Sequence, residues 1–309
     1  MKVLITGGGG FVGRQVLDIL AKRPDIQDII VAGRTPPLPR DPRFRSEVVD
    51  LLEPGAPEAL VARTKPSHLL HLAWNVAPGA FWRAPDNLDW MASSLKLARA
   101  FAEHGGVRFV GAGSVAEYAW DRPRLDRDQT PLLGATLYGV AKDALRRALE
   151  AGLRESGTSF AWGRIFWLYG PHEQPRRLVS DVAAALAAGM PIDCTDGRQI
   201  RDFMHVRDVA GAFVAALDSS WTGAFDIASG NGVAISEVVR LLADAAGAHD
   251  LVRLGARPSA PTDPPEIVGD DYLLRNAIGY HPTIPLRDGL FETLAWWKAR
   301  FQDPSASPL

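Results

Sequence analysis

The sequence predicts an α/β protein built on a doubly wound parallel sheet, with a smaller α/β lobe toward the C-terminus. Three observations lead to this prediction. Short uninterrupted apolar runs recur along the first half of the chain, helical patterns lie between most of them, and a glycine-rich turn follows the first run. Strands that are apolar on both faces and joined by helical crossovers form parallel sheets covered on both sides.

The first strand, turn and helix are the clearest elements. Val3, Leu4 and Ile5 form an apolar run that ends at glycines, and apolar residues then recur at helical spacing from Phe11 to Leu20. Further strands are expected at the apolar runs 29–32, 48–49, 69–72, 109–110 and 160–165. Helical patterns cover residues 88–103 and 142–154.

The pattern changes after residue 165. Residues 167–205 mix turns with one helix at 180–188, and residues 225–228 are expected to add one more strand to the large sheet. Ser236 is expected to cap a further helix. Residues 257–265 carry four prolines and predict a surface loop, and residues 302–309 predict a frayed tail.

Composition argues against several classes of protein. The 309 residues carry a net charge of -2, which gives no general attraction to nucleic acid or to an anionic membrane. No apolar run approaches the length of a membrane span, and no signal-peptide pattern opens the chain. The single cysteine, Cys194, can form neither an internal disulfide nor a zinc site of several thiolates. No metal site is predicted, and a reducing cytoplasm is the expected compartment.

The glycine turn predicts a dinucleotide site. Gly7, Gly10 and Gly13 lie between the first strand and the first helix. There a Rossmann fold needs a tight turn, close approach to a pyrophosphate and close helix packing. The amides at the helix N-terminus would face the phosphates. The alternative is a glycine-rich turn with no ligand, and the position at the first strand-helix junction favours the dinucleotide.

The residue after the second strand indicates which dinucleotide binds. An NAD enzyme usually places an acidic residue there, on the ribose 2′-hydroxyl. Here Gly33 ends the strand and Arg34 follows, which favours NADP(H) because a guanidinium pairs with a 2′-phosphate, and NAD(H) is the alternative. Asp50, after the third strand, is a candidate for the adenine amino group. Three further arginines lie along the same proline-rich loop, and a solvated basic loop is the alternative interpretation: Arg40, Arg43 and Arg45.

Tyr138 and Lys142 stand one helical turn apart in TLYGVAK and therefore share one helix face. Hydride transfer at a carbinol carbon needs a proton donor or acceptor at its oxygen, and a neighbouring ammonium would lower the pKa of the phenol from its usual value of about 10. Ser114, after the strand that ends in VGAGS, would hydrogen-bond the same oxygen. Taken alone, Ser114 could equally be an ordinary loop serine.

With these residues in place, the chain resembles the extended short-chain dehydrogenase/reductase family, and specifically its nucleotide-sugar branch of epimerases, dehydratases and ketoreductases. The matching segments run along nearly the whole chain: TGGGGFVG (6–13), Asp50-Leu51, HLAW (71–74), GAGSVAEY (111–118), YGVAK (138–142), RIFWLYGP (164–171) and RDFMHVRDVA (201–210). The resemblance implies a Rossmann domain made of residues 1–165 with 206–231. It also implies a substrate lobe made of residues 166–205 with 232–309.

The resemblance also implies roles for individual residues. It implies catalysis by Ser114, Tyr138 and Lys142, with Lys142 also holding the nicotinamide ribose. Pattern and resemblance together assign these residues to the dinucleotide: Gly7, Gly10, Phe11, Val12, Gly13, Arg34, Asp50, Leu51, Leu72, Ala73, Tyr138 and Lys142. They assign these to the substrate: Trp74, Ser114, Trp167, Leu178, Val179, Arg201 and Arg257. By the resemblance Arg201 contacts a diphosphate, and His205 supports the turn rather than reacting.

Several positions depart from the family pattern. Trp167 replaces an asparagine that contacts the diphosphate, and Trp90 replaces another asparagine, with Asn87 one turn earlier. The C-terminal arginine of the pattern is absent, and Arg257 is the nearest substitute. If Arg201 does not hold the anion, Arg257, or Arg176 with Arg177, is the expected replacement. Where the family dehydrates its substrate it carries an Asp-Glu pair after the serine, and here those places hold Val115 and Ala116.

Aromatic residues gather in the loops that are expected to face the substrate. They are Trp74, Phe81, Trp82, Trp120 and Trp167. Aromatic faces suit sugars and nucleobases, and filling the interface between the lobes is the equal alternative for each residue. His172 and Glu173, in GPHEQP, are expected on a surface turn rather than in the pocket.

Three functions remain open from the sequence. The first is an NADPH-dependent ketoreductase of a nucleotide-linked keto sugar. The second is a nucleotide-sugar 4-epimerase with bound NAD, and the third is an NADP-sensing regulator without turnover. The intact proton-transfer residues argue against a sensor, and the resemblance implies a homodimer formed through a four-helix interface that contains the Tyr138 helix.

Overall fold

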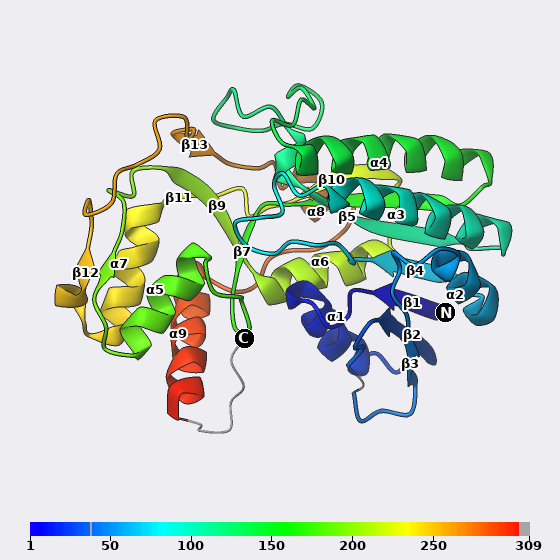
Figure 1. Ribbon diagram of the computed structural model, residues 1–309, viewed down its shortest axis with the longest axis horizontal. Helices are drawn as coiled ribbons and strands as arrows, with labels where there is room; N and C mark the ends of the chain where they lie inside the picture. The colour runs from blue at the N-terminus through cyan, green and yellow to red at the C-terminus, as the bar shows by residue number, and fades with distance from the viewer. Residues whose placement is uncertain (38, 303–309) are drawn as a thin grey trace.

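Seven parallel strands form the large sheet, as predicted (Figure 1). The computed structural model describes residues 1–37 and 39–302. The strand order is β10-β6-β5-β4-β1-β2-β3, and every neighbouring pair is parallel. The strands are β1 (Lys2–Thr6), β2 (Asp28–Gly33), β3 (Phe44–Val48), β4 (His68–His71), β5 (Arg108–Ser114), β6 (Ser159–Ile165) and β10 (Gly223–Ile227). The order reverses between β1 and β4, and in open α/β sheets ligands bind at such a switch point.

Helices cover both faces of this sheet (Figure 1). On one face α1 (Phe11–Ala21) packs against α6 (Val206–Asp218), and the other face carries α2 (Ala56–Thr64), α3 (Asp86–Glu103) and α4 (Leu137–Glu155). Successive strand residues point to opposite faces, so Val3 and Ile5 lie in the core with α1 and α6, whereas Leu4 lies in the core with α3 and α4. The uninterrupted apolar runs of the sequence follow from this double burial.

The predicted third strand begins too late. β3 spans Phe44–Val48, and Val48, one of the two residues on which the prediction rested, is 74% exposed. β3 is an edge strand of the sheet, and Arg45 and Glu47 lie within it. Charged residues at alternate positions of an edge strand interrupt its apolar residues, so the sequence contains no continuous apolar run there.

A second group of elements follows β6. Its strands are β7 (Trp167–Tyr169), β8 (Ile192–Asp193), β9 (Ile200–His205), β11 (Gly232–Ala234), β12 (Val252–Arg253) and β13 (Glu266–Ile267). Its helices are α5 (Leu178–Ala187), α7 (Ile235–Ala246), α8 (Tyr272–Asn276) and α9 (Leu286–Gln302). β9 pairs with β7, β11 and β13, while α5, α7 and α9 pack on one another around their own apolar core. α8 instead packs on β10, and its Leu274 belongs to the core of the large sheet.

Two smaller predictions about this part of the chain can be compared with the structure. Ser236 does not cap α7, because the N-cap is Ala234. Carbonyls of the loop before β9 accept from the first amides of α7: Ile235 N–H donates to Gln199 at 2.9 Å and Ser236 N–H to Gly197 at 2.8 Å. Gln302 ends α9, and the rest of the predicted tail, residues 303–309, lies outside the described residues.

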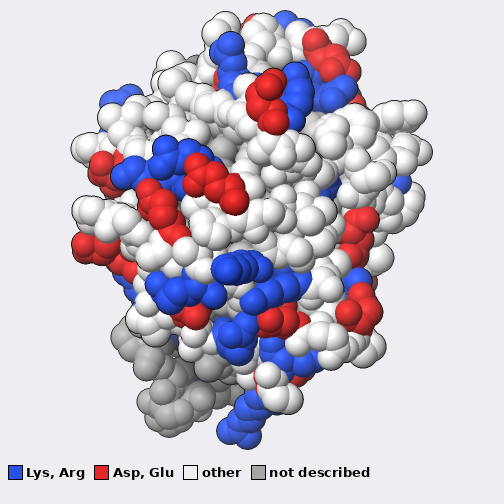
Figure 2. Space-filling view, turned by 90° about the vertical axis from the view of Figure 1, so that its right-hand side faces the viewer, with Lys and Arg blue, Asp and Glu red and all other residues white. Residues whose placement is uncertain are grey.

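Figure 2 shows the face that includes α2 and β3, where basic side chains lie among acidic ones. Arg45 pairs with Asp28 at 2.8 Å and Arg63 with Glu47 at 3.0 Å. The charge of each of these two arginines is therefore balanced by a neighbouring carboxylate. Within residues 1–37 and 39–302, none of the helices combines the length and the apolar character needed to cross a membrane.

Candidate active site

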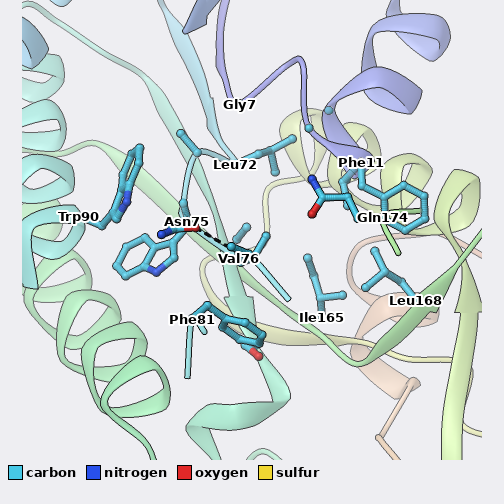
Figure 3. A pocket seen from close by; sticks show the side chains of 18 of the residues that line it. Gly7, Phe11, Leu72, Asn75, Val76, Phe81, Trp90, Ile165, Leu168 and Gln174 are labelled. Atoms are coloured by element: carbon cyan, nitrogen blue, oxygen red, sulfur yellow. Dashed lines mark hydrogen bonds between the residues drawn. The ribbon is translucent and has the colours of Figure 1, made fainter. Parts of the chain in front are cut away.

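An elongated cavity of about 640 Å³ runs along the carboxyl ends of the parallel strands and continues to α5 and β9. In Figure 3, Gly7 and Phe11 lie at one end of the cavity and Phe81 at the other, with Leu72 and Val76 between them. Segments that follow β1, β2, β3, β4, β5 and β6 all contribute to its lining. The cavity therefore occupies the switch point of the sheet, where open α/β folds bind their ligands.

The glycine turn has the geometry that a dinucleotide diphosphate needs. Gly7 adopts a φ of 77°, and a Cβ on Gly13 would stand 2.2 Å from the carbonyl oxygen of Gly7. α1 can therefore start directly against the turn only with glycine at position 13. Gly10 is the N-cap of α1 and supplies no side-chain cap, so the first amides of α1 stay available to a bound phosphate. The residues present fit the predicted dinucleotide.

Arg34 lines the cavity just beyond β2 and is exposed. Two of the other loop arginines are committed elsewhere: Arg43 binds Asp41 and the carbonyls that end α1, and Arg45 pairs with Asp28. Asp50 also lines the cavity, and its Oδ1 accepts from Leu52 N–H at 3.0 Å. Among the described residues that line this end of the cavity, Arg34 is the cationic one.

Ser114, Tyr138 and Lys142 meet on one wall of the cavity. Ser114 ends β5, Tyr138 and Lys142 lie in the first turns of α4, and Thr136 caps that helix by accepting from Gly139 N–H at 3.2 Å. α4 approaches the Ser114 segment closely, because a Cβ on Gly139 would stand 2.1 Å from the carbonyl oxygen of Ala116. Gly139 therefore brings the phenol toward the serine.

The electrostatics of this wall differ from the prediction. Burial raises the pKa of Tyr138 to about 12, and its interactions with Ser114 and Arg177 offset only part of that rise. Burial also lowers the pKa of Lys142 to about 7. The expectation that Lys142 lowers the phenol pKa is wrong for the protein alone. Phe81, Trp74 and Trp82 surround the Tyr138 ring, and such apolar neighbours penalise the phenolate.

Trp74, predicted to face the substrate, also covers Lys142. The Lys142 ammonium lies 3.7 Å from the centre of the Trp74 ring and donates to the carbonyl oxygen of Ala112 at 2.9 Å. Asn87 holds Trp74 by accepting from its indole N–H at 2.8 Å and donates to the carbonyl of Phe81. Asn87 therefore positions the Trp74 ring, and Trp90 also stacks on that ring.

A buried ionic network behind Ser114 escaped the sequence analysis. Glu117 is fully buried, accepts from the Ser114 N–H at 2.9 Å and pairs with Arg164 at 2.7 Å. Arg164 also donates to the hydroxyl of Tyr118, which donates to Asp226 at 2.9 Å. Burial raises the pKa of Asp226 to about 7, although Arg164 and Tyr118 lower it in part. The Ser-x-x-Glu spacing of a capping box was the available signal, and the structure contains that box.

An aromatic wall extends from Tyr138 toward β9. Trp82 contacts Trp120 edge-on at 6.4 Å between ring centres, and Trp120 lies 5.9 Å from Trp167. Phe81, Trp82, Trp120 and Trp167 all line the cavity. The structure thus brings the predicted aromatic residues into one surface that a flat ligand can follow.

Two of the predicted substrate residues lie outside this cavity. Arg201 is 3% exposed, and its guanidinium pairs at 2.5 Å with Asp263, which comes from the proline-rich loop. Arg257 is exposed and belongs to the same loop. The other predicted residues of both groups, among them Leu51, Leu178 and Val179, line the cavity. His205 caps α6 by accepting from Arg207 N–H at 3.2 Å, in agreement with its predicted supporting role.

Glu173 corrects the prediction of a simple surface turn. Its side chain is buried and lines the cavity, and its Oε2 has no hydrogen-bond partner among the residues that the structure describes. Burial raises the pKa of this carboxyl to about 8, against the opposing effect of Arg177. Its neighbour His172 packs against Trp296 with ring centres 4.9 Å apart. The sequence did not reveal this burial because it depends on how the segment folds back on α5, where the Ser180 hydroxyl donates to the carbonyl of Glu173 at 3.2 Å.

Comparison with known proteins places the chain in a family. The model of the family described as "NAD dependent epimerase/dehydratase family" matches residues 3–228, which is more than half of the chain. A dTDP-glucose 4,6-dehydratase of Actinoplanes sp. is 27% identical over 97% of this chain and 98% of the relative. A UDP-glucose 4-epimerase of Azospirillum brasilense is 27% identical over 96% of this chain and 92% of the relative.

A solved structure of MoeE5 in complex with UDP-glucuronic acid and NAD is similar throughout. It superposes with a TM-score of 0.83 at 25% identity and covers 97% of this chain and 99% of that one. The span matched by the family model, residues 3–228, includes the glycine turn, Ser114, Tyr138 and Lys142. The chain belongs to the NAD dependent epimerase/dehydratase family, whose members are enzymes of the oxidoreductase type.

Proposed function

We propose that this protein is an NADPH-dependent ketoreductase that acts on a nucleotide-linked keto sugar. The observation that carries the proposal is the buried phenol of Tyr138, which lines the cavity together with Ser114 and Lys142. Burial keeps Tyr138 protonated at neutral pH, which is the form that gives a proton to a carbonyl oxygen. Glu117, three residues after Ser114, is turned into the buried network, where it accepts from the Ser114 backbone N–H and pairs with Arg164.

The residues have distinct roles in this reaction. When bound, the reduced nicotinamide supplies the hydride. Tyr138 gives its proton to the carbonyl oxygen of the sugar, and Ser114 donates a hydrogen bond to the same oxygen. Lys142, which contacts the Trp74 ring and donates to the carbonyl of Ala112, would bind the nicotinamide ribose. The glycine turn and the first amides of α1 would hold the diphosphate of the dinucleotide.

A nucleotide-sugar 4-epimerase with retained NAD is the second candidate. The 4-epimerase among the relatives and the NAD in the MoeE5 complex favour it. Epimerisation, however, starts by removing a proton from a sugar hydroxyl, for which Tyr138 would have to be a phenolate. Dehydration has less support still, because Val115 and Ala116 replace the acid-base pair.

A panel of UDP-, dTDP-, GDP- and CDP-linked 4-keto sugars with NADPH tests the proposal. We expect one of these sugars to consume one NADPH for each sugar converted. If none does, and UDP-glucose and UDP-galactose interconvert without added reductant, the epimerase is the correct function. Mass spectrometry of the dinucleotide that accompanies the purified protein is an independent test, because the epimerase would retain NAD.

Cofactor choice gives a separate prediction for Arg34. Changing Arg34→Ala should weaken NADPH binding about 10- to 100-fold, because a hydrogen bond to a charged group contributes about 1.5–3 kcal/mol, and should leave NADH binding nearly unchanged. Calorimetric titration measures the affinity for each of the two dinucleotides. Arg40→Ala, which removes a guanidinium of the same loop that does not line the cavity, is the matched control. Equal affinity of the unaltered protein for NADH and NADPH would contradict the assignment.

Two structural expectations belong to the same proposal. Residues 1–165 with 206–231 would bind the dinucleotide, and residues 166–205 with 232–309 would bind the sugar nucleotide. A homodimer through α3 and α4 is supported by two apolar side chains on these neighbouring helices: Leu88 is 51% exposed and Val140 is 52% exposed. We propose that the protein works in the cytoplasm.

A further inference from the structure

We propose that Arg177, together with the first amides of α5, binds an oxyanion of the substrate, a phosphate or a sugar carboxylate, in place of Arg201. The inference rests on the proposed function only in taking a nucleotide-linked sugar as the substrate.

The cavity offers few cations for this task. Among the described residues, its lining contains three cationic side chains: Arg34, Lys142 and Arg177. Arg34 lies at the end of β2, beside the glycine turn, and Lys142 is held by Trp74 and Ala112. Arg177 is the cation that remains at the substrate end.

Arg177 is poorly neutralised within the described part of the chain. Among the described residues, its side chain makes one hydrogen bond, a long one of 3.4 Å to the carbonyl oxygen of Val76, and no carboxylate lies within ion-pair distance of its guanidinium. Glu173 is the acid that shares this part of the cavity lining, and its burial favours the uncharged carboxylic acid. Arg201, by contrast, already has its carboxylate in Asp263. A half-buried guanidinium without a counter-ion is a strong binder of oxyanions.

The position of Arg177 is close to the reacting group. Its guanidinium lies 5.2 Å from the centre of the Phe81 ring, and the Phe81 ring lies edge-on to the Tyr138 ring at 4.9 Å. The positive charge is near enough to lower the pKa of Tyr138 in part. Arg177 and Tyr138 therefore contact the same aromatic ring, that of Phe81.

The start of α5 adds donors at the same place. Arg177 is the N-cap of this ten-residue helix and makes no side-chain cap. The carboxylate of Asp181, in the first turn, accepts instead from the backbone N–H of Arg176 at 2.7 Å. Leu178 and Val179 line the cavity, and the first-turn amides of a helix have no partner within it. The buried Glu173 Oε2, which also lacks a partner, lies in the same lining.

Binding measurements on the full-length protein test this inference without turnover. The probes are UDP, dTDP, UDP-glucose, UDP-glucuronic acid and inorganic pyrophosphate. We expect Arg177→Gln to weaken binding about 10- to 100-fold, Arg177→Lys to recover part of the loss, and Arg176→Gln, the exposed neighbour, to have little effect. Arg201→Gln should change binding less than Arg177→Gln does.

The set of probes identifies the group that Arg177 holds. If Arg177→Gln weakens the binding of UDP, dTDP or pyrophosphate, the group is a phosphate. If it weakens the binding of UDP-glucuronic acid and leaves that of UDP-glucose unchanged, the group is a sugar carboxylate. Pyrophosphate binding that depends on Arg177, without binding of any nucleotide, would support this site and contradict the proposed substrate class. Unchanged binding of every probe by Arg177→Gln, loss in Arg201→Gln instead, or no binding by the unaltered protein would overturn the inference.

Discussion

Changing Tyr138→Phe should reduce turnover about 100- to 10,000-fold, the usual contribution of a positioned general acid. The substitution removes one hydroxyl and little volume. The ring keeps its edge-on contacts with Phe81, Trp82 and Trp74. Steady-state rates with the active keto sugar measure the loss, and dinucleotide titration and thermal unfolding should remain close to those of the unaltered protein.

Tyr272→Phe provides the matched control, because that tyrosine is 64% exposed and lies on α8, away from the cavity. It should keep full activity. Near-normal turnover of Tyr138→Phe would show that another group gives the proton.

Changing Glu117→Ala should lower the free energy of unfolding by about 3–5 kcal/mol, because removal of one partner of a buried ion pair leaves the other charge unpaired. Arg164 is 1% exposed, so water cannot replace the lost carboxylate. The backbone N–H of Ser114 and the indole N–H of Trp162 lose their acceptor as well. Denaturant unfolding followed by fluorescence measures the change.

The same substitution should also reduce turnover at temperatures where the variant stays folded, because Glu117 fixes the backbone of Ser114. Glu47→Ala is the matched control: Glu47 pairs with Arg63 on the surface, and such pairs contribute about 0–1 kcal/mol. Equal losses of stability in the two variants would contradict the structural role given to the buried pair.

Local patterns in the sequence predicted the parts of the site that lie on one element. The spacing of Tyr138 and Lys142 required a helix, and that helix carries both residues into the cavity. The glycine turn required a strand before it and a helix after it, and both are present. In the first case the signal and the structure lie within one helix, and in the second within one strand-turn-helix unit.

Contacts between distant segments could not be predicted in this way. Arg201 meets Asp263 across 62 positions, so a residue that matched a diphosphate motif turned out to be paired within the protein. The ammonium of Lys142, in α4, contacts the indole of Trp74, which lies in the loop after β4. The pKa of Tyr138 rises because three aromatic side chains from the loop after β4 surround it, and helix spacing contains no information on that burial.

Hydride transfer to the sugar carbonyl is the central claim, and an isotope measurement tests it most directly. The protein is incubated with its keto sugar and NADPH that carries deuterium at the transferred position of nicotinamide C4, and the product is examined by mass spectrometry and NMR. The account predicts one deuterium on the former carbonyl carbon of the product, with very little product formed by Tyr138→Phe. A product without deuterium, formed by protein that retains bound NAD and uses no added reductant, would contradict it.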